Sequence, residues 1–272
     1  MLDYKQNLSI LFFLGLTCNF SYAEKASSML EGFCKNYGPQ TPRDINKKNG
    51  DNPSVFSFAP ESKNLNLCNI HFHKNAEHKS TYYSTKANSG LGYQCNIDNN
   101  FTKLTKKELE PLAHNYCKGI KPGDTIEVHW VYSSCRVQPG KGLGSCLSEQ
   151  CANPDLKAEA QVFLLVNDNT ATNFKDFMYN PKSAKSNYHQ TYALPSNTGK
   201  PVKYLGSATG EGLSKQECSN LSVSWSIRPQ CARLDINSLN EWCKDNIFKE
   251  DHAHPSRKLM NHPKFLSQIS YR

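Results

Sequence analysis

The chain has 272 residues, with 32 Lys and Arg against 24 Asp and Glu, which gives a formal net charge of +8. A nucleic-acid-binding surface is typically a dense basic stripe. Here the basic residues are scattered, apart from pairs such as Lys47-Lys48 and Lys106-Lys107. The composition therefore predicts a solvated basic face and no nucleic-acid partner.

The N-terminal segment has the pattern of a secretory signal peptide. Lys5 provides a short basic lead, residues 8–18 form an apolar run, and Ser21-Tyr22-Ala23 resembles a cleavage site with small residues. The apolar run is too short to span a bilayer as a helix, so we expect no stable membrane insertion; a buried N-terminal helix is the alternative. We therefore expect residues 1–23 to be a signal peptide and residues 24–272 to be one exported domain, periplasmic or secreted. The Lys- and Asn-rich composition favours a bacterial periplasm.

The sequence has 11 cysteines, and Cys18 is the one that lies within the expected signal peptide. An even number then remains in an exported chain, which predicts disulfide bonds. No Cys-x-x-Cys pair occurs, which argues against a zinc ribbon or a thioredoxin-type motif. Spacing alone leaves the pairing of the cysteines open.

The remaining elements follow from hydrophobic periodicity and turn residues. After a polar, loop-rich start to about residue 66, strands and helices alternate with long polar connections. Residues 137–154 hold glycines and two cysteines, as expected for a disulfide-bonded loop. The pattern predicts a single, mainly β domain with strands at 67–73, 93–97, 125–133, 158–166, 202–206 and 221–227, and helices at 106–117 and 234–246.

Histidines are placed on two of these strands. Side chains of a strand alternate between its faces, so His71 and His73 point the same way, together with Asn69 and Leu67. His129 lies on a second strand, and Glu127, two residues earlier, shares its face and could accept a hydrogen bond from it. Three histidines with an open position are typical of a catalytic zinc site. From spacing alone, buried core histidines explain the pattern equally well.

Four segments, in this order, carry a family resemblance. The second is the most specific, and the order strengthens the others. The segments are GPQTPRDI at 38–45, CNIHFHKNAEHK at 68–79, EVHW at 127–130 and YLGSAT at 204–209. With these segments the chain resembles the delta-class carbonic anhydrases and, more distantly, the alpha class.

The resemblance implies a fold and a reaction. The fold would be similar to that of alpha carbonic anhydrases, with a central, mostly antiparallel twisted sheet and short peripheral helices. One Zn²⁺ per chain would be held by His71, His73 and His129, with Glu127 accepting a hydrogen bond behind the ligands. The reaction would be the reversible hydration of carbon dioxide to bicarbonate and a proton.

The resemblance also implies roles around the metal. Thr209 would orient the attacking oxygen, and Glu77 would accept a hydrogen bond from Thr209. Val131 would line the apolar pocket for carbon dioxide, and His78 would be structural rather than a ligand.

The chain also departs from the family pattern. Ala208 replaces a larger apolar residue, and the Pro-Pro pair expected after Thr209 is missing, which weakens the assignment of Thr209. His189 is a candidate proton shuttle, although a solvated loop histidine is the simpler interpretation. The pair His252 and His254 is expected in an exposed tail.

Two other function classes stay open. One is a non-catalytic binding protein, periplasmic or secreted, that retains zinc. The other is a different zinc hydrolase such as an esterase. The sequence contains neither the His-Glu-x-x-His nor the Gly-x-Ser-x-Gly motif, so it gives no support to the common metalloprotease or serine hydrolase schemes. The oligomeric state is open.

Overall fold

The computed structural model describes residues 34, 36–96, 103–185, 187–208 and 218–269. The chain divides into the units Met1–Asn36 and Tyr37–Arg272, and every element below belongs to the second. The expected signal peptide, residues 1–23, lies outside the described residues. Within the described ranges, we find no helix with the length and apolar character needed to cross a membrane.

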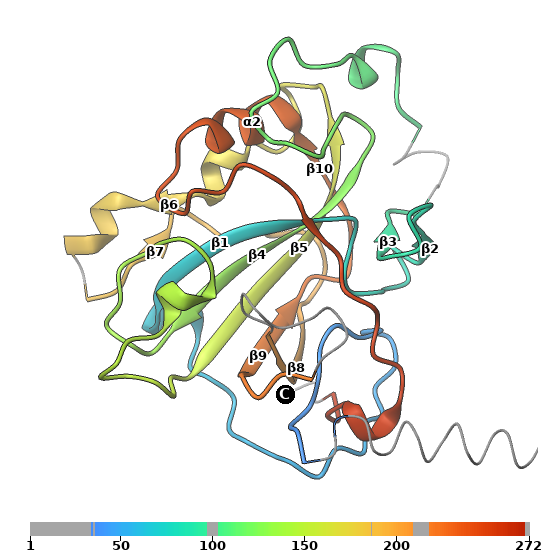
Figure 1. The fold of residues 1–272 in the computed structure, drawn as a ribbon. Coiled ribbons are helices and arrows are strands. Elements are labelled where there is room, and N and C mark those ends of the chain that lie inside the picture. The colour runs from blue at the N-terminus through green and yellow to red at the C-terminus, as the bar shows by residue number, and fades with distance from the viewer. Residues whose placement is uncertain (1–33, 35, 97–102, 186, 209–217, 270–272) are drawn as a thin grey trace, which may run out of the picture. The chain divides into compact units, whose positions relative to one another are not determined.

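One mixed sheet forms the centre of the second unit (Figure 1). Its order is β11-β1-β4-β5-β9-β8, and β10 pairs with β5 in addition. The long pairings β1–β4, β4–β5 and β8–β9 are antiparallel, whereas β11, β10 and β9 join their neighbours β1 and β5 in parallel. The strands are β1 (Asn66–Lys74), β4 (Thr125–Ser133), β5 (Leu156–Val166), β8 (Val202–Ser207), β9 (Ser222–Ile227), β10 (Ala232–Asp235) and β11 (His254–Pro255).

Smaller elements surround this sheet. The helix α2 (Ile236–Lys244) begins at Asp235, whose side chain accepts a hydrogen bond from the Asn237 backbone N–H, as an N-cap does. Short 3₁₀ helices lie at Ser62–Asn64, Lys107–Leu109, Leu143–Cys146, Phe174–Phe177, Pro181–Lys185 and Pro263–Phe265. Two-stranded sheets pair β2 (Thr85–Lys86) with β3 (Tyr93–Gln94) and β6 (Tyr179–Asn180) with β7 (Gln190–Thr191). The predicted mainly β architecture with short peripheral helices is confirmed.

Alternation along the strands separates two hydrophobic clusters, one on each face of the sheet. On β5, the even-numbered residues from Leu156 to Val166 belong to the first cluster, which also contains Trp225. The odd-numbered Phe163 and Leu165 belong to the second cluster, which includes residues of α2. Because both faces are covered, β5 is buried along its whole length.

Disulfide bonds tie the loops to the sheet. The bonds join Cys68 to Cys146, Cys95 to Cys231, Cys117 to Cys243, and Cys135 to Cys151. Cys34 and Cys218 are disulfide-bonded as well. The prediction that the cysteines after Cys18 are oxidised is therefore confirmed.

The helix predicted at residues 106–117 is wrong. Only Lys107–Leu109 forms a 3₁₀ turn, and Glu110 is extended (ψ 130°). The cause is Pro111, because a residue before proline is disfavoured in helical conformation. Two apolar side chains of this segment are exposed, with 46% of Leu109 and 36% of Tyr116 accessible.

Other predictions change in detail. The pairing of β1 with β4 shifts register between Leu67 and Asn69, so Leu67 packs with the second cluster and not on the face of His71. The predicted helix at 234–246 begins later, because Ala232–Asp235 forms β10.

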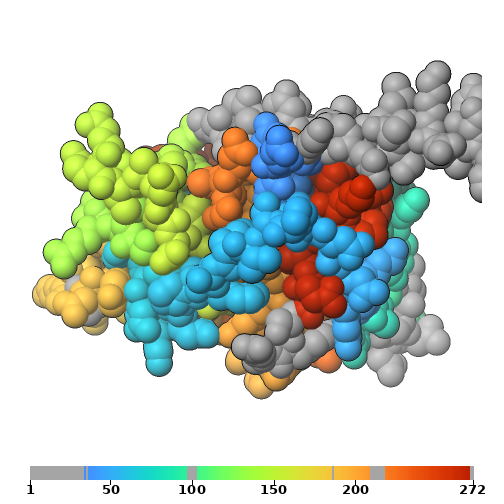
Figure 2. Space-filling view, turned by 90° about the horizontal axis from the view of Figure 1, so that it is seen from below, coloured from blue at the N-terminus to red at the C-terminus, as the bar shows by residue number. Residues whose placement is uncertain are grey.

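The C-terminal region is also not the expected exposed tail. His254 and Pro255 form β11 at the edge of the sheet. Beyond it, residues 260–269 lie beside residues 40–52, joined by backbone hydrogen bonds such as those between Gln40 and Phe265 (Figure 2).

Candidate metal centre

Three histidines converge on the face of the sheet that carries the first cluster. His71 and His73 point from β1, and His129 lies directly opposite His71 on β4. Nδ1 of His129 is 3.2 Å from Nε2 of His71. One nitrogen from each of the three rings lies within 4.8 Å of the others, which is close enough for one metal ion. The structure thus brings together the three predicted ligands.

The nitrogen of each ring that points away from this centre faces an oxygen acceptor. Nδ1 of His71 is 2.7 Å from Oδ1 of Asn69, and Nδ1 of His73 is 3.2 Å from the carbonyl oxygen of Pro255. Nε2 of His129 is 2.8 Å from Oε1 of Glu127. A neutral imidazole carries one proton, and a carbonyl or carboxylate accepts it. The protons therefore sit on the outer nitrogens, and the inner nitrogens carry lone pairs.

This donor set fits a zinc ion. Lone pairs that face one another at 3.2 Å repel, and a cation between them removes the repulsion. Burial and neighbouring histidines lower the pKa of His71 well below its ordinary value. Burial also lowers the pKa of His73, to about 4, although Glu77 opposes this effect. Both rings are thus neutral at physiological pH, as metal ligands must be.

Glu127 is held in a buried network behind His129. Its Oε1 also accepts from Nδ1 of His78 at 2.5 Å, and its Oε2 accepts from the His78 backbone N–H at 3.0 Å. Nε2 of His78 then accepts from the hydroxyl of Tyr204 at 2.6 Å. Burial raises the pKa of Glu127, but His78 and these hydrogen bonds outweigh it and hold the pKa well below its usual range.

A second cluster of potential ligands consists of His78, Glu127 and His129. Here the facing atoms are already joined as hydrogen-bond donors and acceptors. No spare lone pair of His78 or His129 faces this point, so the cluster is a hydrogen-bond network that positions a ligand.

Glu77 lies beside the centre and is fully buried. Arg257 donates to it from its backbone N–H (2.9 Å), Nε (3.1 Å) and Nη2 (3.2 Å), and Nδ1 of His73 is 3.4 Å away. Burial raises the pKa of Glu77, but Arg257 and the histidines hold it well below its usual value. Thr209, the expected partner of Glu77, lies outside the described residues.

A small cavity of ≈ 50 Å³ opens on the histidines. Its other walls are largely apolar, and they include Val131, Leu143, Val223 and Trp225. Val131 therefore lies where the resemblance implies. The volume suits one or two small molecules, since water occupies about 30 Å³ in the liquid.

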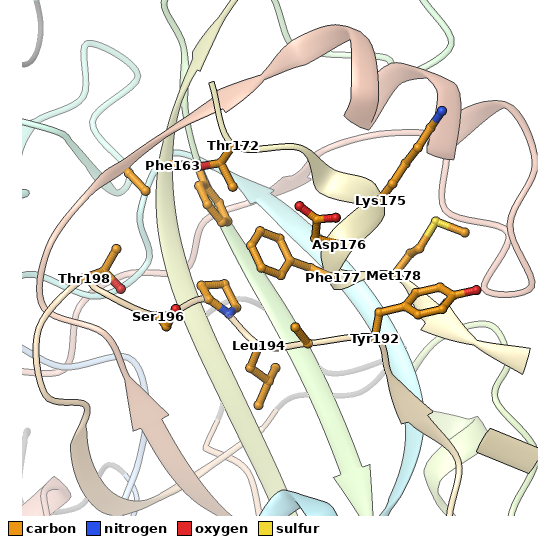
Figure 3. Close-up of a pocket in the computed structure, with 13 residues that line it drawn as sticks. Phe163, Thr172, Lys175, Asp176, Phe177, Met178, Tyr192, Leu194, Ser196 and Thr198 are labelled. Carbon is orange, nitrogen blue, oxygen red and sulfur yellow. The ribbon is translucent and has the colours of Figure 1, made fainter. Parts of the chain in front are cut away.

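A larger cavity lies elsewhere. It measures ≈ 840 Å³ and sits over Phe163, which belongs to the second cluster on the reverse face of the sheet (Figure 3). Phe177 and Leu194 also line it, whereas the amine of Lys175 points away from the other labelled side chains. It contains none of the three histidines, so the smaller cavity is the candidate centre.

Sequence reasoning missed several neighbours of the centre. Asn69 could have been found, because it lies two residues before His71 on the same strand face. Arg257 gave no signal, because it follows the last predicted element. His254 was recognised as part of a His-x-His pair but expected in an exposed tail, whereas its ring is 5.7 Å from that of His71. His189 is bound to the hydroxyl of Tyr179 at 2.9 Å and does not line the cavity.

The lowered histidine pKa values predict an acid-labile metal-free protein. The pKa of His73 is about 4 in the folded state and near its ordinary value of 6.5 when the chain is unfolded. The unfolded chain therefore binds more protons between these values, and the free energy of unfolding falls as the pH drops from 6.5 towards 4. Urea unfolding of the metal-free protein at several pH values measures this loss. In the variant His73→Gln the free energy of unfolding should depend less steeply on pH. An equal slope in both proteins would contradict the assignment of the lowered pKa to His73.

Comparison with known proteins now gives the family. A family model described as delta carbonic anhydrase matches residues 62–238, well over half of the chain. The chain belongs to the delta carbonic anhydrase family. It is accordingly a carbonic anhydrase, a lyase that hydrates carbon dioxide.

Among solved structures, the chain is similar to the alpha carbonic anhydrase from Thermovibrio ammonificans in complex with the inhibitor sulfanilamide. The identity is 14%, the match covers 83% of this chain and 86% of that chain, and the TM-score is 0.31. A structural match with a TM-score this low adds no support to the assignment of the family. A search of curated proteins finds no match.

Proposed function

We propose that the protein hydrates carbon dioxide with one Zn²⁺ bound by Nε2 of His71, Nε2 of His73 and Nδ1 of His129. The observation that carries the proposal is the convergence of these nitrogens, with each outer nitrogen facing an acceptor. When bound, zinc lowers the pKa of water and so supplies a nucleophile near neutral pH. Neutral imidazoles leave the charge of the ion undiminished.

The residues around the ion would orient the reactants. Glu127 keeps the proton of His129 on Nε2, which leaves Nδ1 for the metal. Val131, Val223 and Trp225 offer carbon dioxide an apolar wall. Glu77, ionised beside Arg257, would accept a hydrogen bond from Thr209 and so direct the hydroxyl oxygen of Thr209 towards the attacking group.

The test is carbon dioxide hydration by the purified protein, before and after zinc is removed and restored. We expect a rate that disappears with the metal and returns with one zinc per chain. A protein that binds one zinc per chain without hydrating carbon dioxide would favour the non-catalytic binding protein. A protein that binds no metal would contradict the site.

Replacement of Thr209 separates orientation from metal binding. We expect Thr209→Ala to keep its zinc and lose about 10²-fold or more in rate, as the loss of one positioned hydrogen-bonding group does elsewhere. Thr209→Ser keeps the hydroxyl and should restore most of the rate. A Thr209→Ala protein at full rate would contradict the role of Thr209.

Export through a signal peptide at residues 1–23 belongs to the same proposal. The disulfide bonds support it, because they form and persist in oxidising compartments. The N-terminal sequence of the mature protein would locate the cleavage site, expected after Ala23.

A further inference from the structure

A second cavity on the reverse face of the sheet is lined by four basic and two acidic residues. It measures ≈ 530 Å³, and residues of β5, β8 and β9 form part of its lining. Pairing places Lys203, Ser226 and Glu159 in one row across these strands. Their neighbours on the same strands, such as Trp225 and Ala158, face the histidine cavity. Since side chains alternate between the faces, the row points away from the metal centre.

Arg228 supplies a guanidinium at this cavity that its protein contacts do not saturate. Its side chain is only 8% exposed. Nε donates to the carbonyl of Pro195 at 2.6 Å, and Nη1 donates to Oε2 of Glu159 at 3.2 Å. Nη2 makes no hydrogen bond to any residue that the structure describes. Nη2 also has access to solvent, because among the described residues the fully buried side-chain nitrogen and oxygen atoms without a partner are Arg43 Nε and Glu250 Oε1.

Ser226 places a second donor beside it. Ser226 lies on β9, and Arg228 follows one residue after the end of this strand; both line the cavity. Ser226 is only 2% exposed, yet its hydroxyl has no hydrogen-bond partner within the described part of the chain. Like Nη2 of Arg228, this hydroxyl keeps some access to solvent. Arg228 and Ser226 therefore both line this cavity, each with one donor atom that has no acceptor within the described residues.

The lining has a net positive charge, because its basic residues outnumber the carboxylates of Glu61 and Glu159. Glu61 is paired with Lys157 and Lys203. The buried carboxylate of Glu159 is already neutralised by Arg228 and by Lys157, whose Nζ is 3.6 Å from Oε1. Lys63 and Lys200 line the cavity, are exposed, and form no ion pair with any described residue. Free lysines around a pair of unsatisfied donors favour an anion with several acceptor oxygens.

We infer that this reverse-face cavity binds an oxyanion, a phosphate or carboxylate group, between Arg228 Nη2, Ser226 Oγ and the amines of Lys63 and Lys200. The proposed activity at the histidine centre does not depend on this site. The volume also leaves room for a small organic group attached to the oxyanion, which would pack against Leu194 and Pro201.

The test is calorimetric titration of the zinc-loaded protein with inorganic phosphate and, separately, with benzoate. We expect one site per chain for at least one probe, and the preferred probe identifies the oxyanion. The double variant Lys63→Gln/Lys200→Gln should bind about tenfold more weakly, because charge interactions of exposed lysines are screened by solvent and each is weak. Both lysines are exposed and unpaired within the described ranges, so this variant should fold normally.

Two further variants complete the design. Lys106→Gln/Lys121→Gln removes the same charge from exposed lysines that do not line the cavity, and should bind like the wild type. Arg228→Lys keeps the charge but loses the forked donors, so it should also weaken binding. Failure of both probes to bind the wild type would overturn the inference. So would unchanged binding by the Lys63→Gln/Lys200→Gln variant, since that result would place the anion elsewhere, for example at the metal.

Discussion

His129→Ala should lose zinc and activity together. The substitution removes one of the three inward lone pairs and leaves His71 and His73 as a two-nitrogen site, which is incomplete for zinc. We expect the zinc affinity to fall more than about 100-fold. Loss of a ligand should cost more affinity than loss of a residue that only positions a ligand. Hydration of carbon dioxide should fall to the rate of buffer. Zinc competition with a chelator and stopped-flow hydration measure the two effects.

The control for this prediction is His114→Ala. His114 is exposed, does not line the cavity of the predicted ligands, and has a ring contact to Tyr116. It should keep the zinc affinity and rate of the wild type. A His129→Ala protein that retains stoichiometric zinc with wild-type affinity would remove His129 from the ligand set.

Glu127→Gln should weaken zinc binding by about 10- to 100-fold. The substitution keeps the shape but puts an N–H₂ group where one carboxylate oxygen accepted. Glu127 accepts from His78 twice and from His129 once, so the amide cannot satisfy every donor. An amide N–H aimed at Nε2 of His129 would move the ring proton to Nδ1, the nitrogen that should bind zinc.

Glu241→Gln provides the matched control, because Glu241 is exposed on α2. Near-UV circular dichroism should show that both variants are folded before zinc affinity is compared. Equal zinc affinity of Glu127→Gln and the wild type would show that Glu127 does not set the protonation of His129.

Much of the central sheet could be predicted from the sequence. The strand at residues 125–133 has the predicted bounds, because β-branched and aromatic residues make up most of the segment from Thr125 to Ser133. The predicted ligands lie together because period-two spacing fixes which face of a strand a side chain leaves. Their pairing across β1 and β4 was not visible in the spacing, since register depends on contacts between strands.

The errors arose where tertiary contacts outweigh local pattern. Leu109 and Leu112 have helical spacing, but Pro111 ends the turn that begins at Lys107. His254 lies in a polar segment without strand periodicity, and it joins the sheet only because β1 offers an unpaired edge. Arg257, the partner of Glu77, follows from this docking. The sequence offered the His-x-His spacing of His252 and His254, but no local signal for Arg257 or for the strand at His254.

The most direct test of the metal centre is a crystal structure with anomalous diffraction measured at the zinc absorption edge. We predict one peak per chain, about 2.0–2.1 Å from Nε2 of His71, Nε2 of His73 and Nδ1 of His129. A zinc ion bound instead between His78 and Glu127, or at His252 and His254, would contradict the assignment of these ligands.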